Sequence, residues 1–427
     1  MDALCIRAAR LITGRGREVI DDAVVFVEGG RIAAAGRAAE LPAPTPGVPS
    51  VTYPQGTLLP GLVDAHVHLT FRRGETSVEH AQRVSDEQAL LRGVQAAGRI
   101  LAAGVTTVRD CGARGRIAQA LRDGVRDGFI AGPRLLASGP PVTTTAGHLW
   151  AVGYEADTAD EGRRAVRRLV KEGADFIKVC ATGGGMTPGS MVGRAQYSVA
   201  ELRAIVDDAH RLGRHVAAHA HGTEGIARAV EAGVDTLEHV SWLDLTGRQP
   251  AFDERVAQEM ARRGIVANIA SSAPRDLVER GRPSSGAGSA GDGRGDAAAA
   301  STRPAPVRWE HARRMRELGV AVCFSTDAIY GWWDDGHDLS YLAQALVEGG
   351  GFAPLDVIEM LTAVPARAIG WGDRIGTIEA GKLADLLVVE GDPATDIRAL
   401  HRVLAVYQEG SRQSGPSIKG AGDANAI

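Results

Sequence analysis

Cysteine is scarce in this chain of 427 residues, and no two cysteines form a CxxC pair. The four that occur stand far apart, at Cys5, Cys111, Cys180 and Cys323. A disulfide framework is typical of short secreted chains rich in cysteine, whereas isolated cysteines in apolar runs are typical of reduced core thiols. We therefore expect free thiols and a cytoplasmic location.

Long apolar runs and an excess of one charge are also missing. No segment approaches the roughly 18 apolar residues that a membrane span needs, and the opening MDALCIRAARLITGRG lacks the features of a secretory leader. Lysine and arginine number 48 against 52 acidic residues, which gives a net charge of -4. Because that balance offers no basic face to nucleic acid or to an anionic membrane, we expect neither partner.

Large apolar residues are absent from one internal segment. Residues 281–306 consist mainly of glycine, alanine, serine and proline. Such a segment cannot bury enough apolar surface to offset the entropy lost on ordering, so it is predicted to be a flexible insertion. Residues 413–427 are predicted to be a disordered tail.

The middle of the chain alternates short apolar runs with segments of helical period. In the helical segment 198–213, Ser198 and Glu201 form a capping-box signature and Gly213 marks the C-terminal end. Eight strand–helix units in about 300 residues predict an α/β fold, a (β/α)8 TIM-type barrel spanning 61–372. The predicted strands are 62–68, 105–110, 134–139, 175–181, 215–220, 235–240, 264–270 and 320–327.

Both ends of the chain hold short β runs separated by glycine turns. Residues 1–60 and 373–412 each look too small and too poor in strands for a hydrophobic core of their own. We therefore predict that the two segments assemble one small β-sandwich domain beside the barrel.

Side chains that bind metals recur where the predicted barrel strands end. His66 and His68 are two residues apart on one strand, so both imidazoles point to the same face. Lys178 stands mid-strand between apolar neighbours, where an unpaired ammonium is costly. The remaining candidates at strand ends are His219, His221, His239 and Asp327. Because the carboxyl ends of barrel strands share one face, these residues predict a metal hydrolase site.

Plainer interpretations of the same residues stay open at this point. Hydrogen-bonded core histidines would give a similar pattern, Lys178 could pair with a carboxylate, and Asp327 could cap the helix that follows it. His219 and His221 compete for one ligand position. The convergence of all these residues on one barrel face favours the metal site.

With these residues in view, the chain resembles the amidohydrolase superfamily, and most closely its prolidase-like branch of metal-dependent dipeptidases and N-acyl amino acid hydrolases. The matching stretches are LLPGLVDAHVHL, AGVTTVRDCG, DFIKVCATGG, HVAAHAHGTEGIARAVEAGVDTLEH, STDA and IGTIEAGKLADLLVVEGDP. The resemblance implies two divalent metal ions, with zinc as the expected element, and a CO2-derived carbamate on Lys178 that bridges them. It favours His219 over His221. The implied metal ligands are His66, His68, Lys178, His219, His239 and Asp327.

The resemblance also implies roles in catalysis and in substrate binding. Asp327 would take the proton of a metal-bridged hydroxide and deliver it to the leaving amine, and His148 would reach the scissile carbonyl. Tyr197 and Arg194, on the loop after the strand of Lys178, are candidates for a substrate carboxylate, and His221 is a further substrate-binding candidate. Supporting or pocket-wall roles are expected for Asp110, Trp332 and Trp333.

The predicted activity is hydrolysis of an amide bond in a small molecule, a dipeptide or N-acyl amino acid, by a homo-oligomeric enzyme. A cyclic amide or lactone hydrolase, of the imidazolonepropionase or hydantoinase type, is the alternative. Relatives of the imidazolonepropionase type use one metal and lack the bridging lysine, so Lys178 argues against them, but a hydantoinase or lactonase type would keep it. A metal-binding scaffold without catalysis is disfavoured because all six implied ligands are present.

Overall fold

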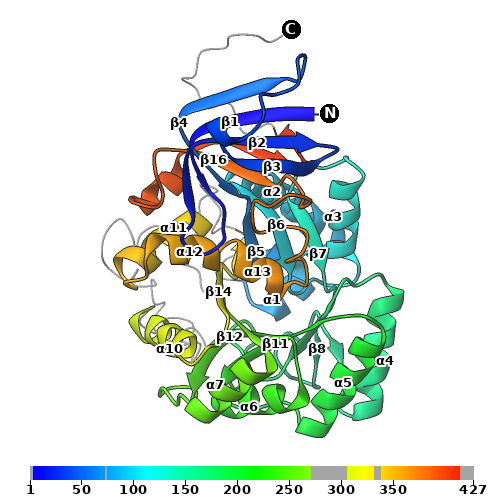
Figure 1. The fold of residues 1–427 in the computed structure, drawn as a ribbon. Helices are drawn as coiled ribbons and strands as arrows, with labels where there is room; N and C mark the ends of the chain where they lie inside the picture. The colour runs from blue at the N-terminus through cyan, green and yellow to red at the C-terminus, as the bar shows by residue number, and fades with distance from the viewer. Residues whose placement is uncertain (1–2, 73–74, 271–304, 331–337, 414–427) are drawn as a thin grey trace, which may run out of the picture.

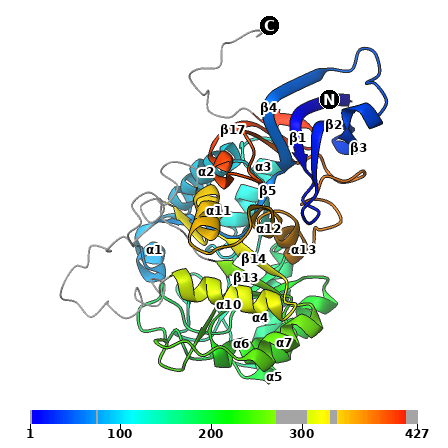
Figure 2. The same cartoon turned by 60° about the vertical axis from the view of Figure 1, so that its left-hand side comes forward.

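The structure is a computed structural model that describes residues 3–72, 75–270, 305–330 and 338–413. The strands from the two chain ends form one seven-stranded sheet, the end sheet (Figure 1). Two further sheets, of seven and four strands, make the barrel wall. Helices α5 (Val199–Arg211), α6 (Thr223–Ala232) and α7 (Glu254–Arg263) lie on the side of the barrel opposite the end sheet (Figures 1 and 2).

Eight parallel strands in the described residues form the barrel, and each coincides with an apolar run that the sequence predicted as a strand. They are β5 (Leu62–Arg72), β6 (Val105–Asp110), β7 (Arg134–Ala137), β10 (Ile177–Cys180), β11 (Val216–Gly222), β12 (Thr236–Leu243), β13 (Val266–Ala270) and β14 (Val322–Ser325). The short strands β8 (Val142–Thr143), β9 (Tyr154–Glu155) and β15 (Ala328–Tyr330) extend the sheets. The predicted TIM-type barrel is confirmed.

Helices alternate with these strands, as parallel pairing requires. Besides α5, α6 and α7 they are α1 (Ser77–Arg83), α2 (Asp86–Ala102), α3 (Ile117–Arg126), α4 (Ala159–Lys171), α10 (Ala305–Glu317), α11 (Asp338–Glu348), α12 (Pro354–Met360) and α13 (Ala363–Ala368). Helix α5 begins with the predicted capping box of Ser198 and Glu201, and Gly213 beyond its end has a φ of +67°. Only glycine adopts that conformation readily, so the predicted end of this helix is confirmed.

The end sheet joins strands that are more than 300 residues apart in sequence, with β4 at its centre. β4 pairs with β1 in parallel and with β16 in antiparallel fashion, and its buried Leu58 packs with Leu386 and Val388. The strands are β1 (Ala3–Ile12), β2 (Val19–Glu28), β3 (Arg31–Arg37), β4 (Ser50–Pro60), β16 (Leu386–Glu390), β17 (Val403–Gln408) and β18 (Ser411–Gln413), with 3-10 turns at Ala38–Glu40 and Ile397–His401. The predicted joining of the two chain ends in one β domain is confirmed, but its described strands form a single mixed sheet where a sandwich was expected. The predicted sequence boundaries of this domain stay a prediction.

The structure bears on two expectations from the sequence, free thiols and helices too short or too polar to span a membrane. All four cysteines are free and buried. Burial raises the pKa of the Cys111 and Cys180 thiols to about 12, so both stay protonated at neutral pH. Among the described helices, none has the length and apolar character needed to cross a membrane.

The predicted insertion and tail fall mostly outside the described residues. Of 281–306, only 305 and 306 are described, as the first residues of α10. Residues 414–427 lie outside, as do Trp332 and Trp333.

Candidate metal centre

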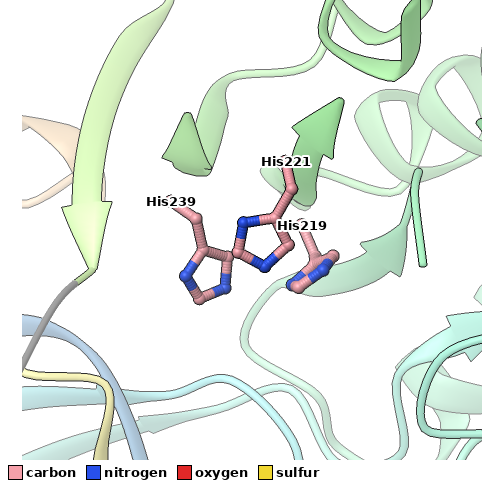
Figure 3. Close-up of side chains that lie close together, drawn as sticks. All are labelled: His219, His221 and His239. Carbon is pink, nitrogen blue, oxygen red and sulfur yellow. The ribbon is translucent and has the colours of Figure 1, made fainter. Parts of the chain in front are cut away.

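Seven side chains of metal-binding type meet at the end of the barrel where the strands have their carboxyl termini. They are His66 and His68 on β5, Lys178 on β10, His219 and His221 on β11, His239 on β12, and Asp327 two residues after β14. The ring centroids of His219, His221 and His239 lie 4.5 to 4.6 Å apart, and Figure 3 shows the three rings gathered together. The structure therefore brings together all six predicted ligands, and it places His221 among them.

The possible ligand atoms form two groups that share one histidine. One nitrogen each of His219, His221 and His239 lie within 4.8 Å of one another. A second set of mutually close atoms comes from His66, His239 and Asp327. Asp327 Oδ1 lies 3.5 Å from His66 Nε2 and 3.7 Å from His68 Nε2. The arrangement therefore offers metal-binding atoms on two sides of His239.

Neighbouring oxygens determine which ring nitrogen of three histidines carries the proton. The contacts are His66 Nδ1 to Glu238 Oε2 at 2.8 Å, His68 Nδ1 to Gly112 O at 3.1 Å, and His219 Nε2 to Gly183 O at 3.0 Å. Carbonyl and carboxylate oxygens only accept, so each of these nitrogens donates. The opposite nitrogens, Nε2 of His66 and His68 and Nδ1 of His219, therefore keep lone pairs for a metal.

Burial keeps these imidazoles neutral. It lowers the pKa of His68 to about 4 and of His221 to about 3, and it lowers the pKa of the other cluster histidines far below the usual range. The positive charge of Lys178 acts in the same direction. Only a neutral imidazole can bind a metal, so the cluster is a ready donor set at neutral pH.

Lys178 is buried beside these neutral rings, and its side chain is 1% exposed. Its Nζ lies 3.4 Å from His66 Nε2, and none of the ion pairs among the described residues includes it. The alternative of a lysine paired with a carboxylate therefore finds no support in the described part of the chain. An ammonium without a counter-charge is costly in such a place, whereas an anionic carbamate would suit it.

Asp327 sits on a strained backbone, and its carboxyl group has an altered acidity. Its φ is +51°, and His239 across the site has a φ of +69°. Such values cost about 1–3 kcal/mol for residues other than glycine and are found at functional sites. Desolvation raises the pKa of Asp327 to about 7, although the charge of Lys178 opposes the shift. The group can therefore exchange a proton near neutral pH.

Asp110 supports the ligands from behind, as the sequence suggested. Its carboxylate accepts the backbone N–H groups of Leu69 at 3.0 Å and Gly112 at 3.1 Å. Because the carbonyl of Gly112 contacts His68 Nδ1, Asp110 orients this predicted ligand indirectly.

Two charged residues at the site were missed by the sequence reasoning. Glu238 is fully buried and contacts His66. Its signal was an acidic residue directly before His239 within a predicted strand. The second is Arg308 on α10. Burial is the largest cause of two pKa shifts at the site, because it raises the pKa of Asp327 and lowers that of His221. The positive charge of Arg308 lowers the pKa of both groups. No local motif marks Arg308, which follows the insertion in sequence.

His148 lies next to His219 and against the loop that contains Gly184. Its buried ring lies 4.4 Å from that of His219, and burial lowers its pKa far below the usual range. A Cβ atom on Gly184 would come within 2.5 Å of the His148 ring, so a side chain there would displace it. The absence of a side chain at Gly184 thus lets this loop approach His148 closely.

Tyr197, a predicted candidate for a substrate carboxylate, is buried in the structure. Its side chain is 1% exposed and belongs to the same hydrophobic cluster as Leu202. Tyr197 directly precedes the N-cap Ser198, and Leu202 is four residues beyond that cap, which is the spacing of a hydrophobic staple. Its hydroxyl is buried without a hydrogen-bond partner among the described residues. Tyr197 therefore orders the start of α5 and offers no accessible group to a substrate.

Replacing Tyr197 with phenylalanine should leave KM unchanged for every substrate. The free energy of unfolding should stay equal or rise by about 1 kcal/mol, because a buried hydroxyl without a partner is removed. Thermal unfolding and steady-state kinetics on one preparation measure both effects. A large rise in KM for substrates with a free carboxylate would return Tyr197 to the substrate site.

Arg194 remains a candidate for substrate binding. Its residue is exposed, and its carbonyl oxygen accepts the N–H of Gly183 at 3.2 Å. Since the carbonyl of Gly183 contacts His219, the backbone of Arg194 lies one step from the metal centre.

A separate cavity of about 950 Å³ opens at the opposite end of the barrel, where the strands begin. Two of the arginines that line it are paired with carboxylates, Arg122 with Asp175 and Arg134 with Asp385. None of the six predicted metal ligands lines this cavity, so it is separate from the metal centre.

Comparison with known proteins identifies the family. The model of the amidohydrolase family matches residues 57–412, and the chain belongs to this family. It is 30% identical to ochratoxinase from Aspergillus niger over 450 aligned positions, covering 97% of this chain and 87% of the relative. It is 27% identical to imidazolonepropionase from Rhizorhabdus wittichii, covering 90% and 92% of the two chains.

Among solved structures, a Xaa-Pro dipeptidase with bound methionine superposes with a TM-score of 0.82 and 28% sequence identity. The match covers 97% of this chain and 100% of the dipeptidase. Together with the histidine cluster, these similarities define a metal-dependent amidohydrolase of the prolidase-like branch, which acts on carbon–nitrogen bonds.

Proposed function

We propose that this protein hydrolyses the amide bond of a dipeptide or an N-acyl amino acid at a centre of two divalent metal ions. The observation that carries the proposal is Lys178, buried among neutral histidines with no ion pair among the described residues. A carbamate on this lysine would supply the anion that joins two cations and would remove the cost of the buried charge.

The donor set is suited to two cations. His66, His68 and Asp327 would hold one, His219 and His239 the other, and the Lys178 carbamate would lie between them. His221 is a further donor at the second position, because its ring nitrogen lies within 4.8 Å of those of His219 and His239. When bound, the two ions lower the pKa of a water molecule and polarise the substrate carbonyl.

Two side chains have roles in the chemistry itself. The Asp327 carboxylate, close to His66 and His68, would accept the proton of the attacking water and return it to the leaving nitrogen. His148, neutral and next to His219, donates an N–H to the carbonyl oxygen as negative charge develops there.

A cyclic amide or lactone hydrolase is the second candidate. The similarity to an imidazolonepropionase favours it, but the buried Lys178 argues against the type with one metal. A screen of N-acyl amino acids, dipeptides, hydantoins and lactones, with metal analysis of the same preparation, tests both. Turnover of the cyclic compounds alone would overturn the dipeptide and N-acyl amino acid proposal.

The substrates proposed here carry a free carboxylate, which needs a cation near the metals. Arg308 acts electrostatically on Asp327 and His221, and Arg194 lies on the loop that reaches Gly183. Changing either arginine to methionine should raise KM about ten- to a hundredfold for acids and little for the matching amides, since a charge-assisted hydrogen bond contributes about 1.5–3 kcal/mol.

The matched control for these variants is Arg398→Met, which removes an exposed arginine paired with Asp396 outside the metal centre. Steady-state kinetics on acid and amide pairs measures the effect. Equal activity of the wild-type protein on acid and amide forms would contradict carboxylate recognition and favour the cyclic substrates.

A further inference from the structure

The fully buried carboxylate of Glu238 contacts Nδ1 of His66, and the other ring nitrogen, Nε2, is the one proposed to bind a metal. Glu238, on β12, receives contacts from four other strand residues of the barrel wall. They are His66 Nδ1 at 2.8 Å and Asn268 Nδ2 at 2.7 Å to Oε2, and Arg109 Nη2 at 2.6 Å and Thr236 Oγ1 at 2.7 Å to Oε1. Each oxygen thus accepts two hydrogen bonds, and every acceptor position of the carboxylate is used.

Arg109 is held as firmly as the carboxylate that it contacts. It is 1% exposed, its Nε donates to the carbonyl of Ala65 at 2.7 Å, and its Nη1 lies 3.3 Å from Thr236 Oγ1. Its guanidinium also stands 5.1 Å from the centre of the Phe176 ring. The pair is therefore a fixed element, and the position of Glu238 does not depend on His66.

A third metal position at this place does not fit the charges. His66, Cys111 and Glu238 do offer atoms within 4.8 Å of one another. However, the guanidinium of Arg109, 2.6 Å from Glu238, would repel a cation, and burial raises the pKa of Cys111 to about 12, so its thiol stays protonated.

We propose that Glu238 is a positioning residue that holds His66 with its proton on Nδ1 and its Nε2 lone pair facing the metal, while Arg109 fixes Glu238. This inference rests on the metal centre of the proposed function. A carboxylate behind a ligating histidine fixes the ring orientation and increases its basicity as a ligand. The Nδ1 of His68 contacts the neutral carbonyl of Gly112, whereas the Nδ1 of His66 contacts a carboxylate. Of the two predicted ligands on β5, His66 therefore has the stronger acceptor.

The substitution Glu238→Gln tests the proton arrangement with almost no change in volume. A glutamine offers one oxygen and one NH2 group, and four donors surround it. If the NH2 group faces His66, the ring must accept at Nδ1, so its proton moves to Nε2 and blocks the metal. If the NH2 group faces Arg109 and Thr236, it meets two donors, and in either orientation the buried guanidinium loses its counter-charge.

Zinc affinity of the metal-free full chain, measured by competition with a chromophoric chelator, should fall about 10- to 100-fold in Glu238→Gln. In 15N spectra of metal-free protein with labelled histidine, the His66 signals should show a smaller share of the Nδ1–H form than in the wild type. Should the glutamine variant not fold, Glu238→Asp retains the charge but is one methylene shorter, and it should also weaken zinc binding.

The control is Asp385→Asn, which weakens another buried carboxylate–arginine pair, with Arg134, outside the metal centre. It should lower thermal stability without changing zinc affinity. Unchanged zinc affinity in a folded Glu238 variant would overturn the positioning role while leaving the proposed function intact. Failure of the wild-type chain to bind zinc would overturn the proposed function, and this inference with it.

Discussion

Replacing Asp327 with asparagine should lower kcat by about two to four orders of magnitude, the range seen when a general acid–base group is lost. The amide keeps the shape of the side chain but cannot accept and return a proton. Its oxygen can still lie near His66 and His68, where Oδ1 of the aspartate is 3.5 and 3.7 Å from the ring nitrogens. The variant should therefore fold and retain most of its metal.

Steady-state kinetics and metal analysis on the same sample separate the two roles of Asp327. Loss of metal together with activity would make it mainly a ligand, and near-normal turnover would place the proton transfer elsewhere, with His221 as the next candidate. Asp356→Asn, which changes a surface ion pair with Arg17, is the matched control and should leave kcat unchanged.

Replacing Lys178 with methionine should abolish binding of the second metal ion and nearly all activity. The substitution removes the amine that would carry the carbamate, so the metal content should fall from about two ions to one or none per chain. Without metal, the variant should be at least as stable as the wild type, because a buried ammonium with no ion pair among the described residues is removed.

The carbamate can be tested separately from the metal count. Zinc uptake by the metal-free wild-type protein should accelerate with added bicarbonate, and uptake by Lys178→Met should not respond. A methionine variant that holds two ions and turns over substrate would contradict the bridging role of Lys178.

Much of the fold could be predicted from the chain because the signals are local. A parallel barrel strand is buried on both faces, so it appears in the sequence as a short, mostly apolar run such as 264–270, where the structure has β13. The capping box of α5 is equally local, since all its atoms lie within four residues. His66 and His68 share a face because of strand periodicity alone.

The sequence by itself thus determined the barrel, the sharing of a β-sheet by both ends, and the residues that meet at one barrel face. Only the tertiary structure decided the surroundings of these residues. It placed Tyr197 beneath α5, Glu238 behind His66, and the charge of Arg308 near Asp327. The physical reason is that hydrogen bonding, burial and electrostatic interaction act through space, between residues as far apart as His66 and Glu238, and no local pattern records such distances.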